Sequence, residues 1–182
     1  MKITTPRLII REFKEKDIAD IVANRNSLNV LENHSLIHNN KKDVRSQVLL
    51  NQKQVGKKKR ENYSLGIELK SNHKLIGGID IYKVDRFLGK ATMGYWLGKD
   101  YWRQGIMYEA AQAMIEFAFN KLELKRIDLD TSTKNIPSNG LIKKLGFRYE
   151  GTRRKYHGPK AKGTCWHNAN FYGLLASKYK TK

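Results

Sequence analysis

Apolar and polar positions alternate in two different rhythms along the chain, and the change of rhythm separates the expected strands from the expected helices. β-branched and aromatic residues are dense in seven short segments, which is the pattern of strands. We expect strands at residues 3–13, 63–69, 74–84, 91–97, 126–132, 147–150 and 166–175. Pro6 lies inside the first of these segments. Proline favours an edge strand because it has no N–H to donate to the sheet.

The segments between the strands repeat apolar residues at helical spacing, three and four positions apart. We expect helices at residues 17–26, 43–56, 105–121 and 138–145, with a loop at 24–40 and a basic turn at 57–61. Asp43 is placed to cap the second helix and Gly146 to end the last one. The order of strands and helices predicts an α+β (mixed α/β) fold, and the length predicts a single domain over residues 1–182.

The chain is strongly basic, with 36 Lys and Arg against 17 Asp and Glu and a formal net charge of +19. The excess lies in the two flanks of the chain and is densest at residues 57–60 and 153–155. Such runs attract phosphates, nucleic acid or acidic proteins. The same runs also suit an ordinary solvated surface, so both interpretations stay open at this point.

Cysteine content and hydropathy bear on the location of the protein. The single cysteine, Cys165, excludes a disulfide framework within the chain and fits a reducing compartment. No apolar run approaches the ~20 residues of a membrane span. Residues 1–11 lack the long apolar stretch and cleavage site of a signal peptide. We therefore expect a soluble, cytoplasmic protein with no membrane partner.

A strand, a loop and a long helix follow one another between Gly94 and Ala110, and this order suits an anion site. The N–H groups at a helix start have no partners within the helix, and the helix dipole adds positive charge there. Gly105 has no side chain, so a phosphate group can approach the backbone closely, and Arg103 adds a cation beside it. An ordinary helix start, in which Gly105 only eases the turn, explains this stretch equally well.

Three further motifs resolve this choice. In chain order, the four motifs are residues 5–11 (TPRLIIR), 94–110 (GYWLGKDYWRQGIMYEA), 135–147 (NIPSNGLIKKLGF) with Glu150-Gly151, and 168–175 (NANFYGLL). Together they resemble the GNAT acetyltransferase superfamily, and within it the Rim-like branch of ribosomal-protein alanine N-acetyltransferases. Each motif alone is common, but four in this order and spacing are specific, and the resemblance covers nearly the whole chain.

The resemblance implies a GNAT fold, with a central mixed, mostly antiparallel and splayed sheet flanked by helices. It implies acetyl-CoA as co-substrate, without a metal, in the opening between the strands at residues 91–97 and 126–132. The residues expected to contact acetyl-CoA are Trp96 and Leu97 through backbone pairing with the pantetheine arm, Gln104, Gly105, Ile106, Met107 and Tyr108 through N–H groups on the pyrophosphate, Arg103 beside it, Asn135 and Ser138 near the thioester, and Lys143 or Lys144 at the adenosine phosphates.

The chain departs from the family pattern at several positions. Its phosphate loop begins with Trp102, which the Rim-like branch also has, but ends with Met107. Methionine is bulkier than the usual Gly or Ala, and we expect it to crowd the cofactor. Many acetyltransferases place a tyrosine four residues before the Gly-Phe pair as the acid for the leaving thiolate. That residue is Ile142 here, so this chemistry is absent. Asn168 or His167 stands where the branch often has an aspartate.

Acetyl transfer to an amine needs a group that takes a proton from the ammonium, a donor for the carbonyl oxygen and an acid for the thiolate. The backbone N–H of Leu97 is placed for the carbonyl oxygen. Ser138 matches the candidate acid of the Rim-like branch, although a serine at this position also suits the cap of the short helix. His157 is a candidate base because histidine titrates near pH ~6.5, against the alternative of a loop histidine among basic neighbours.

Several other reactive side chains are expected to take no part in the chemistry. Glu109 lies within the long helix and is expected to support the structure. Cys165 has no neighbour that marks it as a nucleophile. His34 and His38 lack the acidic or cysteine partners that would complete a metal site.

The net charge also bears on the acceptor. A basic protein repels polyamines and aminoglycosides and attracts acidic proteins and ribosomal RNA. A protein α-amine titrates near ~8 and therefore needs only a weak base. We expect the acceptor to be an acidic protein N-terminus, such as that of a ribosomal protein, in a groove bounded by residues 24–40 and 154–163. The ribosome and its RNA are the expected surroundings, and the enzyme is expected to be a monomer or a homodimer.

Two other functions stay open. Met107 and the basic flanks favour a ribosome-binding or nucleic-acid-binding module on a degenerate acetyltransferase scaffold, which would not bind acetyl-CoA. A small-molecule amine acetyltransferase is the other alternative, and it would prefer amine drugs to peptides.

Overall fold

The computed structural model describes residues 1–25, 40–158 and 166–179. In chain order the elements are β1 (Lys2–Thr4), β2 (Leu8–Glu12), α1 (Ile18–Arg25), α3 (Lys41–Gln52), β3 (Tyr63–Leu69), β4 (Leu75–Asp85), β5 (Lys90–Leu97), α4 (Ile106–Asn120), β6 (Arg126–Ser132), α5 (Ile136–Lys144), β7 (Arg148–His157) and β8 (His167–Leu175), with 3-10 turns at Glu15–Asp17, Lys99–Tyr101 and Ala176–Lys178. Within these ranges no helix has both the length and the apolar character needed to cross a membrane.

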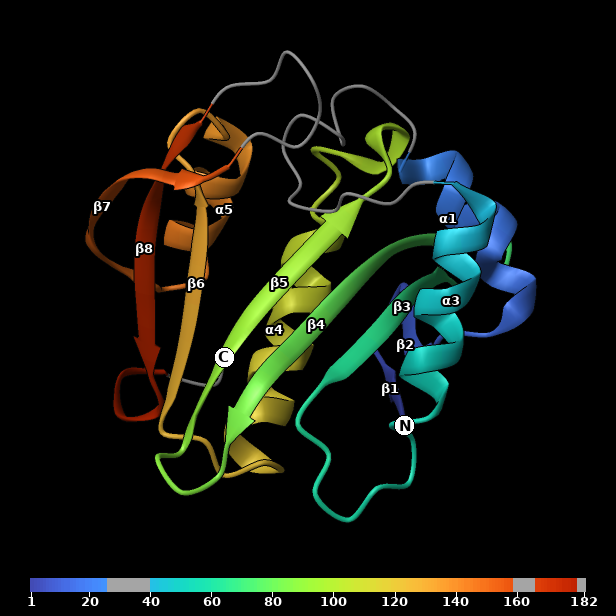
Figure 1. Ribbon diagram of the computed structural model, residues 1–182, viewed down its shortest axis with the longest axis horizontal. Coiled ribbons are helices and arrows are strands. Elements are labelled where there is room, and N and C mark those ends of the chain that lie inside the picture. The colour runs from blue at the N-terminus through green and yellow to red at the C-terminus, as the bar shows by residue number, and fades with distance from the viewer. Residues whose placement is uncertain (26–39, 159–165, 180–182) are drawn as a thin grey trace.

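The strands form an eight-stranded sheet in the order β1-β2-β3-β4-β5-β6-β8-β7. All neighbours are antiparallel except β5 and β6, which run parallel and pair only at residues 90–92 and 126–128. Beyond that point β5 follows β4 as far as Leu97, while β6 follows β8 as far as Ser132. The two strands therefore diverge, as Figure 1 shows. The expected mixed α/β fold with a splayed, mostly antiparallel sheet is confirmed.

Two apolar clusters cover the two faces of this sheet. The buried stripe of α4 packs on one face and consists of Ile106, Met107, Ala110, Ala111, Met114, Ile115 and Ala118. Helices α1 and α3 lie over the other face (Figure 1). Their cluster consists of Phe13, Ile18, Ile21, Val44, Val48, Leu75 and Trp96. The central strands β4 and β5 therefore have α4 on one side and α1 with α3 on the other, so a ligand in the splay has two different faces from which it can be reached.

The first expected strand is wrong in its extent. Residues 3–13 contribute to two strands, β1 and β2, which pair antiparallel. Pro6 lies in the turn between them, and the N–H of Thr5 donates to the carbonyl of Leu8 at 3.0 Å. Proline has no N–H to donate to a strand ladder, so it interrupts the strand, whereas the turn does not need that N–H.

Other boundaries also differ from the expectation, since α3 ends at Gln52 instead of Gly56 and α5 begins at Ile136 instead of Ser138. Two further differences have a clear physical cause. Helix α3 begins at Lys41 because Asn40, and not Asp43, is its cap, with the Asn40 side-chain oxygen accepting the N–H of Asp43 at 2.9 Å. Strand β7 runs on to His157 instead of ending at Glu150. It is an edge strand and is exposed along nearly all of its length, so its sequence lacks the apolar alternation from which a strand is recognised.

A buried ion network fixes the approach to α1. Arg11 on β2 is 7% exposed and donates to both oxygens of Asp17, at 2.7 and 2.9 Å, and to Glu68 at 2.6 Å. Glu68 also contacts the His73 ring at 2.9 Å. Burial alone would raise the pKa of Glu68, but the hydrogen bonds from His73 and Arg11 outweigh it and lower that pKa. The network ties β2, β3 and the turn before α1 together.

We predict that Arg11→Met lowers the free energy of unfolding by about 3–5 kcal/mol, because it leaves the buried carboxylates of Asp17 and Glu68 without their cation. Urea unfolding measures the loss. The matched control is Arg45→Met, which removes an exposed pair with Glu15 at 3.3 Å and should cost at most about 1 kcal/mol. Equal losses in the two variants would contradict the prediction.

Candidate functional site

A cavity of about 830 Å³ occupies the opening between β5 and β6. Most of the residues singled out from the sequence line it, although they come from four separate parts of the chain. They are Trp96, Leu97, Arg103, Gly105, Ile106, Met107, Tyr108, Asn135, Ser138, Lys144 and His157. Gln104 is not in its wall, because its side chain donates to the carbonyl of Asp100 at 2.8 Å and its own carbonyl accepts from Arg7 at 2.9 Å.

The start of α4 presents open backbone N–H groups to this cavity. The first helical hydrogen bond runs from the N–H of Glu109 to the carbonyl of Gly105 at 3.1 Å. The N–H groups from Gly105 to Tyr108 precede that bond, and none of them donates to another described residue. Gly105 has a φ of +72°, a left-handed conformation that favours glycine. An added Cβ would meet only the Arg7 guanidinium, at 3.6 Å, so the backbone conformation and not crowding calls for glycine.

Met107 does not block this corner. It is 7% exposed, and its side chain belongs to the large core cluster beneath the sheet face that α4 covers. The burial of this side chain argues against the expectation that Met107 crowds the cofactor. Helical geometry explains the difference, because at this position in the first turn the side chain points into the core while the N–H points out of the helix start.

Glu109 clamps the phosphate loop to the first hairpin. Its carboxylate accepts the Thr5 hydroxyl at 2.6 Å, the Arg7 backbone N–H at 2.9 Å and the Arg7 side-chain Nε at 2.6 Å. Burial would raise the pKa of Glu109, but these hydrogen bonds outweigh it and lower that pKa. The same Arg7 reaches the carbonyl of Gln104. The expected structural role of Glu109 is confirmed, and the TPRLIIR motif contributes the other half of the clamp.

The edge of β5 offers backbone groups to the opening. The N–H of Gly98 donates across to β4 at 2.9 Å, so by the alternation of an antiparallel ladder the N–H and C=O of Leu97 face the opposite way. The Leu97 carbonyl accepts the indole N–H of Trp102 at 2.8 Å. The same alternation turns the backbone of Trp96 toward β4. The backbone groups that face the opening are therefore those of Leu97 and Tyr95, in place of the expected pair Trp96 and Leu97.

Helix α5 brings a hydroxyl pair to the cavity. The Asn135 side-chain oxygen accepts the N–H of Ser138 at 3.1 Å, so Asn135 is the cap and the alternative that Ser138 caps the helix is wrong. The Ser138 hydroxyl instead contacts the Tyr95 hydroxyl at 2.8 Å. Burial raises the pKa of Tyr95 to about 12, so that Tyr95 keeps its proton at neutral pH. The position at which many acetyltransferases have a tyrosine is Ile142 here, and it is fully buried. Tyr95 was not anticipated from the sequence.

His157 is the last residue of β7, and the alternative of a loop histidine is wrong. Its Nε2 lies 3.2 Å from Oδ2 of Asp130 on β6, and both side chains are 20% exposed. Burial raises the pKa of Asp130, although the charge of His157 opposes the effect. Both residues line the large cavity, and Asp130 was not anticipated from the sequence.

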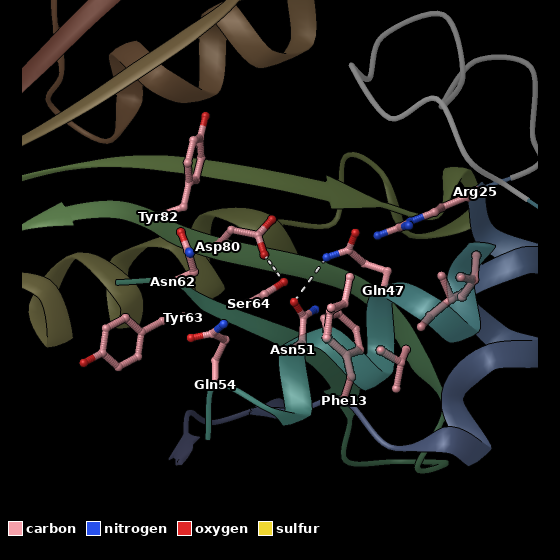
Figure 2. A pocket seen from close by; sticks show the side chains of 14 residues that line it. Phe13, Arg25, Gln47, Asn51, Gln54, Asn62, Tyr63, Ser64, Asp80 and Tyr82 are labelled. Carbon is pink, nitrogen blue, oxygen red and sulfur yellow. Dashed lines mark hydrogen bonds between the residues drawn. The ribbon is translucent and has the colours of Figure 1, made fainter. Parts of the chain in front are cut away.

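A second cavity, of about 400 Å³, lies on the face covered by α1 and α3 (Figure 2). Asp80 and Tyr82 of β4 line both cavities, so the two spaces meet there. The half-buried Asp80 accepts a hydrogen bond from the Ser64 hydroxyl. Burial raises its pKa to about 6, against the opposing effects of Ser64 and of the Arg25 charge. Gly94 on β5 is paired with Asp80 on β4. It leaves room beside Asp80, because an added Cβ would touch only the Tyr82 ring, at 3.4 Å.

Several other candidates from the sequence belong to neither cavity as far as the structure describes them. His34, His38, Cys165 and most of the two expected groove walls fall outside the described residues. Arg60 is 6% exposed and donates to both oxygens of Glu12, so only residues 57–59 of that basic run are exposed. In the described parts of the chain no three His, Cys, Asp or Glu side chains gather closely enough to hold a metal ion.

Known proteins are similar to this chain in sequence and in fold. The acetyltransferase (GNAT) domain family matches residues 7–148. The chain is 31% identical over 181 residues to a Bacillus subtilis protein named uncharacterized N-acetyltransferase YnaD, covering 98% of this chain and 99% of that one. Among solved structures it is similar to the ribosomal-protein-S5-alanine acetyltransferase of Vibrio fischeri, with a TM-score of 0.83 and 21% identity over 100% of both chains. It is also similar to RimL, a ribosomal L7/L12 alpha-N-protein acetyltransferase in complex with coenzyme A, with a TM-score of 0.81 and 17% identity over 98% of this chain and 100% of that one. The fold, the open helix start beside the splay and the family match together place the chain in the GNAT family of N-acetyltransferases.

Proposed function

We propose that this protein transfers the acetyl group of acetyl-CoA to the N-terminal amine of a protein, and that an acidic ribosomal protein is its acceptor. The observation that carries the proposal is the meeting of two cavities at Asp80 and Tyr82. A donor and an acceptor approach that point from opposite faces of the sheet, which favours direct transfer within a ternary complex. The names of the similar Vibrio fischeri and RimL proteins support a ribosomal acceptor.

The large cavity fits the donor. The N–H groups from Gly105 to Tyr108 and the guanidinium of Arg103 are suited to a diphosphate, because a helix start combines unpaired donors with a positive dipole end. Lys144 lies over the Tyr108 ring at 4.9 Å and adds a second cation to the same wall. The edge of β5 at Tyr95 and Leu97 faces the same opening and suits the pantetheine arm, which would lie along it as an added strand does.

The chemistry is assigned to groups that surround the meeting point. Acetyl-CoA supplies the acetyl group as a thioester. Asp80 takes one proton from the acceptor ammonium, and the nitrogen bonds to the carbonyl carbon while the Leu97 N–H donates to the carbonyl oxygen. Ser138, held by Tyr95, donates to the thiolate as the carbon–sulfur bond breaks. The second amine proton leaves as the amide forms, so that one proton ends on the thiol and one in solvent.

Asp80 is a better supported base than His157, the candidate that the sequence offered. Asp80 lies in the walls of both cavities, where an amine and a thioester can meet, whereas His157 lines only the larger one and already contacts Asp130. The competing function, a binding module that has lost acetyl-CoA, loses one of its two supports because Met107 packs into the core.

We predict that the purified protein releases thiol from acetyl-CoA when an acidic peptide with a free N-terminus is present. The same peptide with an acetylated N-terminus is the matched control and should give no release above hydrolysis. Acetyl-CoA alone should also stabilise the fold, by about 2.7 kcal/mol at a hundred times its Kd. No thiol release with any free N-terminus, including those of whole ribosomes, would overturn the proposal.

We predict that Ser138→Ala lowers kcat about 100-fold with little change in the KM for acetyl-CoA, because the variant removes a donor needed only as the thiolate leaves. Steady-state thiol release measures both constants. Ser71→Ala, in the turn between β3 and β4, removes a hydroxyl that lines neither cavity and should leave both constants unchanged. Unchanged turnover in Ser138→Ala would remove Ser138 from the mechanism.

We predict that kcat falls as the pH is lowered through about 6, because Asp80 accepts a proton only in its ionised form. Asp80→Asn should lower kcat about 100-fold or more and abolish this acid limb. His157→Gln is the comparison variant and should retain the limb. A pH–rate profile whose acid limb survives in Asp80→Asn and disappears in His157→Gln would assign the base to His157 instead.

A further inference from the structure

Arg25, the last residue of α1, is a buried cation with no hydrogen-bond partner among the described residues. It is 8% exposed, and its Nε is buried with nothing to accept its proton. No other described residue accepts from the rest of its guanidinium. The guanidinium carbon lies 4.5 Å from the ring centroid of Trp96, which offsets part of the charge but satisfies none of the N–H groups. Buried polar groups in proteins nearly always have partners, so this arginine points to a missing acceptor.

The guanidinium is directed into the smaller cavity. Figure 2 shows Arg25 entering from the end of α1 and pointing toward the side where Gln47 and Asp80 lie. Among the described residues of the wall, Arg25 and Asp80 carry the charges, and they are of opposite sign. The two groups attract each other, yet they form no ion pair between them. The cavity therefore offers one cationic and one anionic group at separate points of its wall.

We propose that Arg25 binds a carboxylate close to the reacting amine, and that the preferred acceptor is a protein N-terminus with Asp or Glu among its first two residues. This inference rests on the proposed function and names the acceptor that the smaller cavity selects. It makes Arg25 a specificity residue, while Asp80 meets the ammonium.

The geometry of the groups supports this assignment. A guanidinium binds a carboxylate through two parallel N–H donors, and such charge-assisted bonds are about twice as strong as neutral ones. The remaining polar wall includes four amides and the Ser64 hydroxyl, and the amides come from Gln47, Asn51, Gln54 and Asn62. Amides of this kind can pair with the backbone of a short peptide. The volume of about 400 Å³ falls within the range of roughly 300–1,000 Å³ that ligand pockets occupy.

The sign of the discrimination follows from the same groups. An acidic side chain next to the amine places a negative charge at Arg25 and a positive charge at Asp80. A lysine or arginine at the same position would place two cations together in the same small cavity. Glutamine keeps the size of glutamate without its charge and would recover only part of the interaction.

The test uses three peptides that share one tail and differ only at the second residue, which is Glu, Gln or Lys. We expect kcat/KM from thiol release to be about 10- to 100-fold higher for the Glu peptide than for the Gln peptide, and lowest for the Lys peptide. Arg25→Met should reduce the Glu-to-Gln ratio about 10-fold or more. Any change that this variant causes in the protonation of Asp80 affects both peptides alike and cancels in the ratio.

The matched control is Arg45→Met, which makes the same charge change on α3, where Arg45 pairs with Glu15 outside the cavity, and should preserve the ratio. Equal rates for the Glu and Gln peptides, or a ratio that survives Arg25→Met, would overturn the inference while leaving the proposed function intact. Free aspartate and glutamate acetylated faster than every peptide would overturn it in favour of a small zwitterionic acceptor.

Peptide binding separates this inference from the proposed function. Calorimetry of the wild-type protein with the same peptides needs no turnover. A Glu peptide that binds about 10-fold more tightly than the Gln peptide supports Arg25 even when no thiol is released. Equal binding of the two peptides contradicts the role of Arg25, whatever the outcome of the turnover assay.

Discussion

The loss of pairing between β5 and β6 is the constraint on which the rest of the site depends. The two strands share three residue pairs, at residues 90–92 and 126–128, and then separate. Each strand keeps its other neighbour, so β5 stays ordered by β4 and β6 by β8, while their inner edges no longer pair with each other. Backbone N–H and C=O groups at such an edge need partners. A ligand that carries amides along its length supplies them, which is why an opening in the middle of a sheet suits a pantetheine arm.

The other parts of the site are positioned relative to this opening. Helix α4 begins just beyond the end of β5, so its unpaired N–H groups face the same cavity. The clamp from Glu109 to Thr5 and Arg7 fixes that corner from the turn between β1 and β2, at one edge of the sheet. On the other side of the opening, Asn139 of α5 accepts hydrogen bonds from Asn170 and Tyr172 of β8, which holds Ser138 at the wall. Three elements distant in sequence thus converge because the sheet order brings them together.

The sequence predicted the elements whose apolar pattern is strong. Strands β3 and β6 fall at the expected residues, and α4 differs by one residue at each end, because burial imposes a clear periodicity on all three. Boundaries set by a single side-chain hydrogen bond were harder to place. Asn40 and Asp43 are both good caps, as are Asn135 and Ser138, and only the folded backbone decides between them. The exposed strand β7 carried no periodic signal at all.

The residues of the candidate site also fall into those that the sequence predicted and those that it did not. Residues contiguous with a motif, such as Gly105, Met107 and Ser138, were found, because one stretch of chain places them together. Tyr95 opposite Ser138 and Asp130 opposite His157 depend on how separate elements pair, which local pattern does not encode. Asp80 did leave a signal, since a carboxylate between Ile79 and Ile81 interrupts a strand that is otherwise almost continuously apolar. Burying a charged group in such a position lowers the stability of the fold, and a functional role is one reason for its presence there.

Global and local charge act on the acceptor at different stages. A net charge of +19 creates a field that attracts acidic partners, but salt screens it beyond roughly 8 Å. That field therefore governs encounter, and it cannot tell one acidic N-terminus from another once contact is made. Inside the smaller cavity the charges of Arg25 and Asp80 balance, so selection there depends on where an acceptor places its own charges rather than on their sum. A basic surface and an electrically balanced pocket are consequently compatible, because the first sets how often an acceptor arrives and the second sets which acceptor stays.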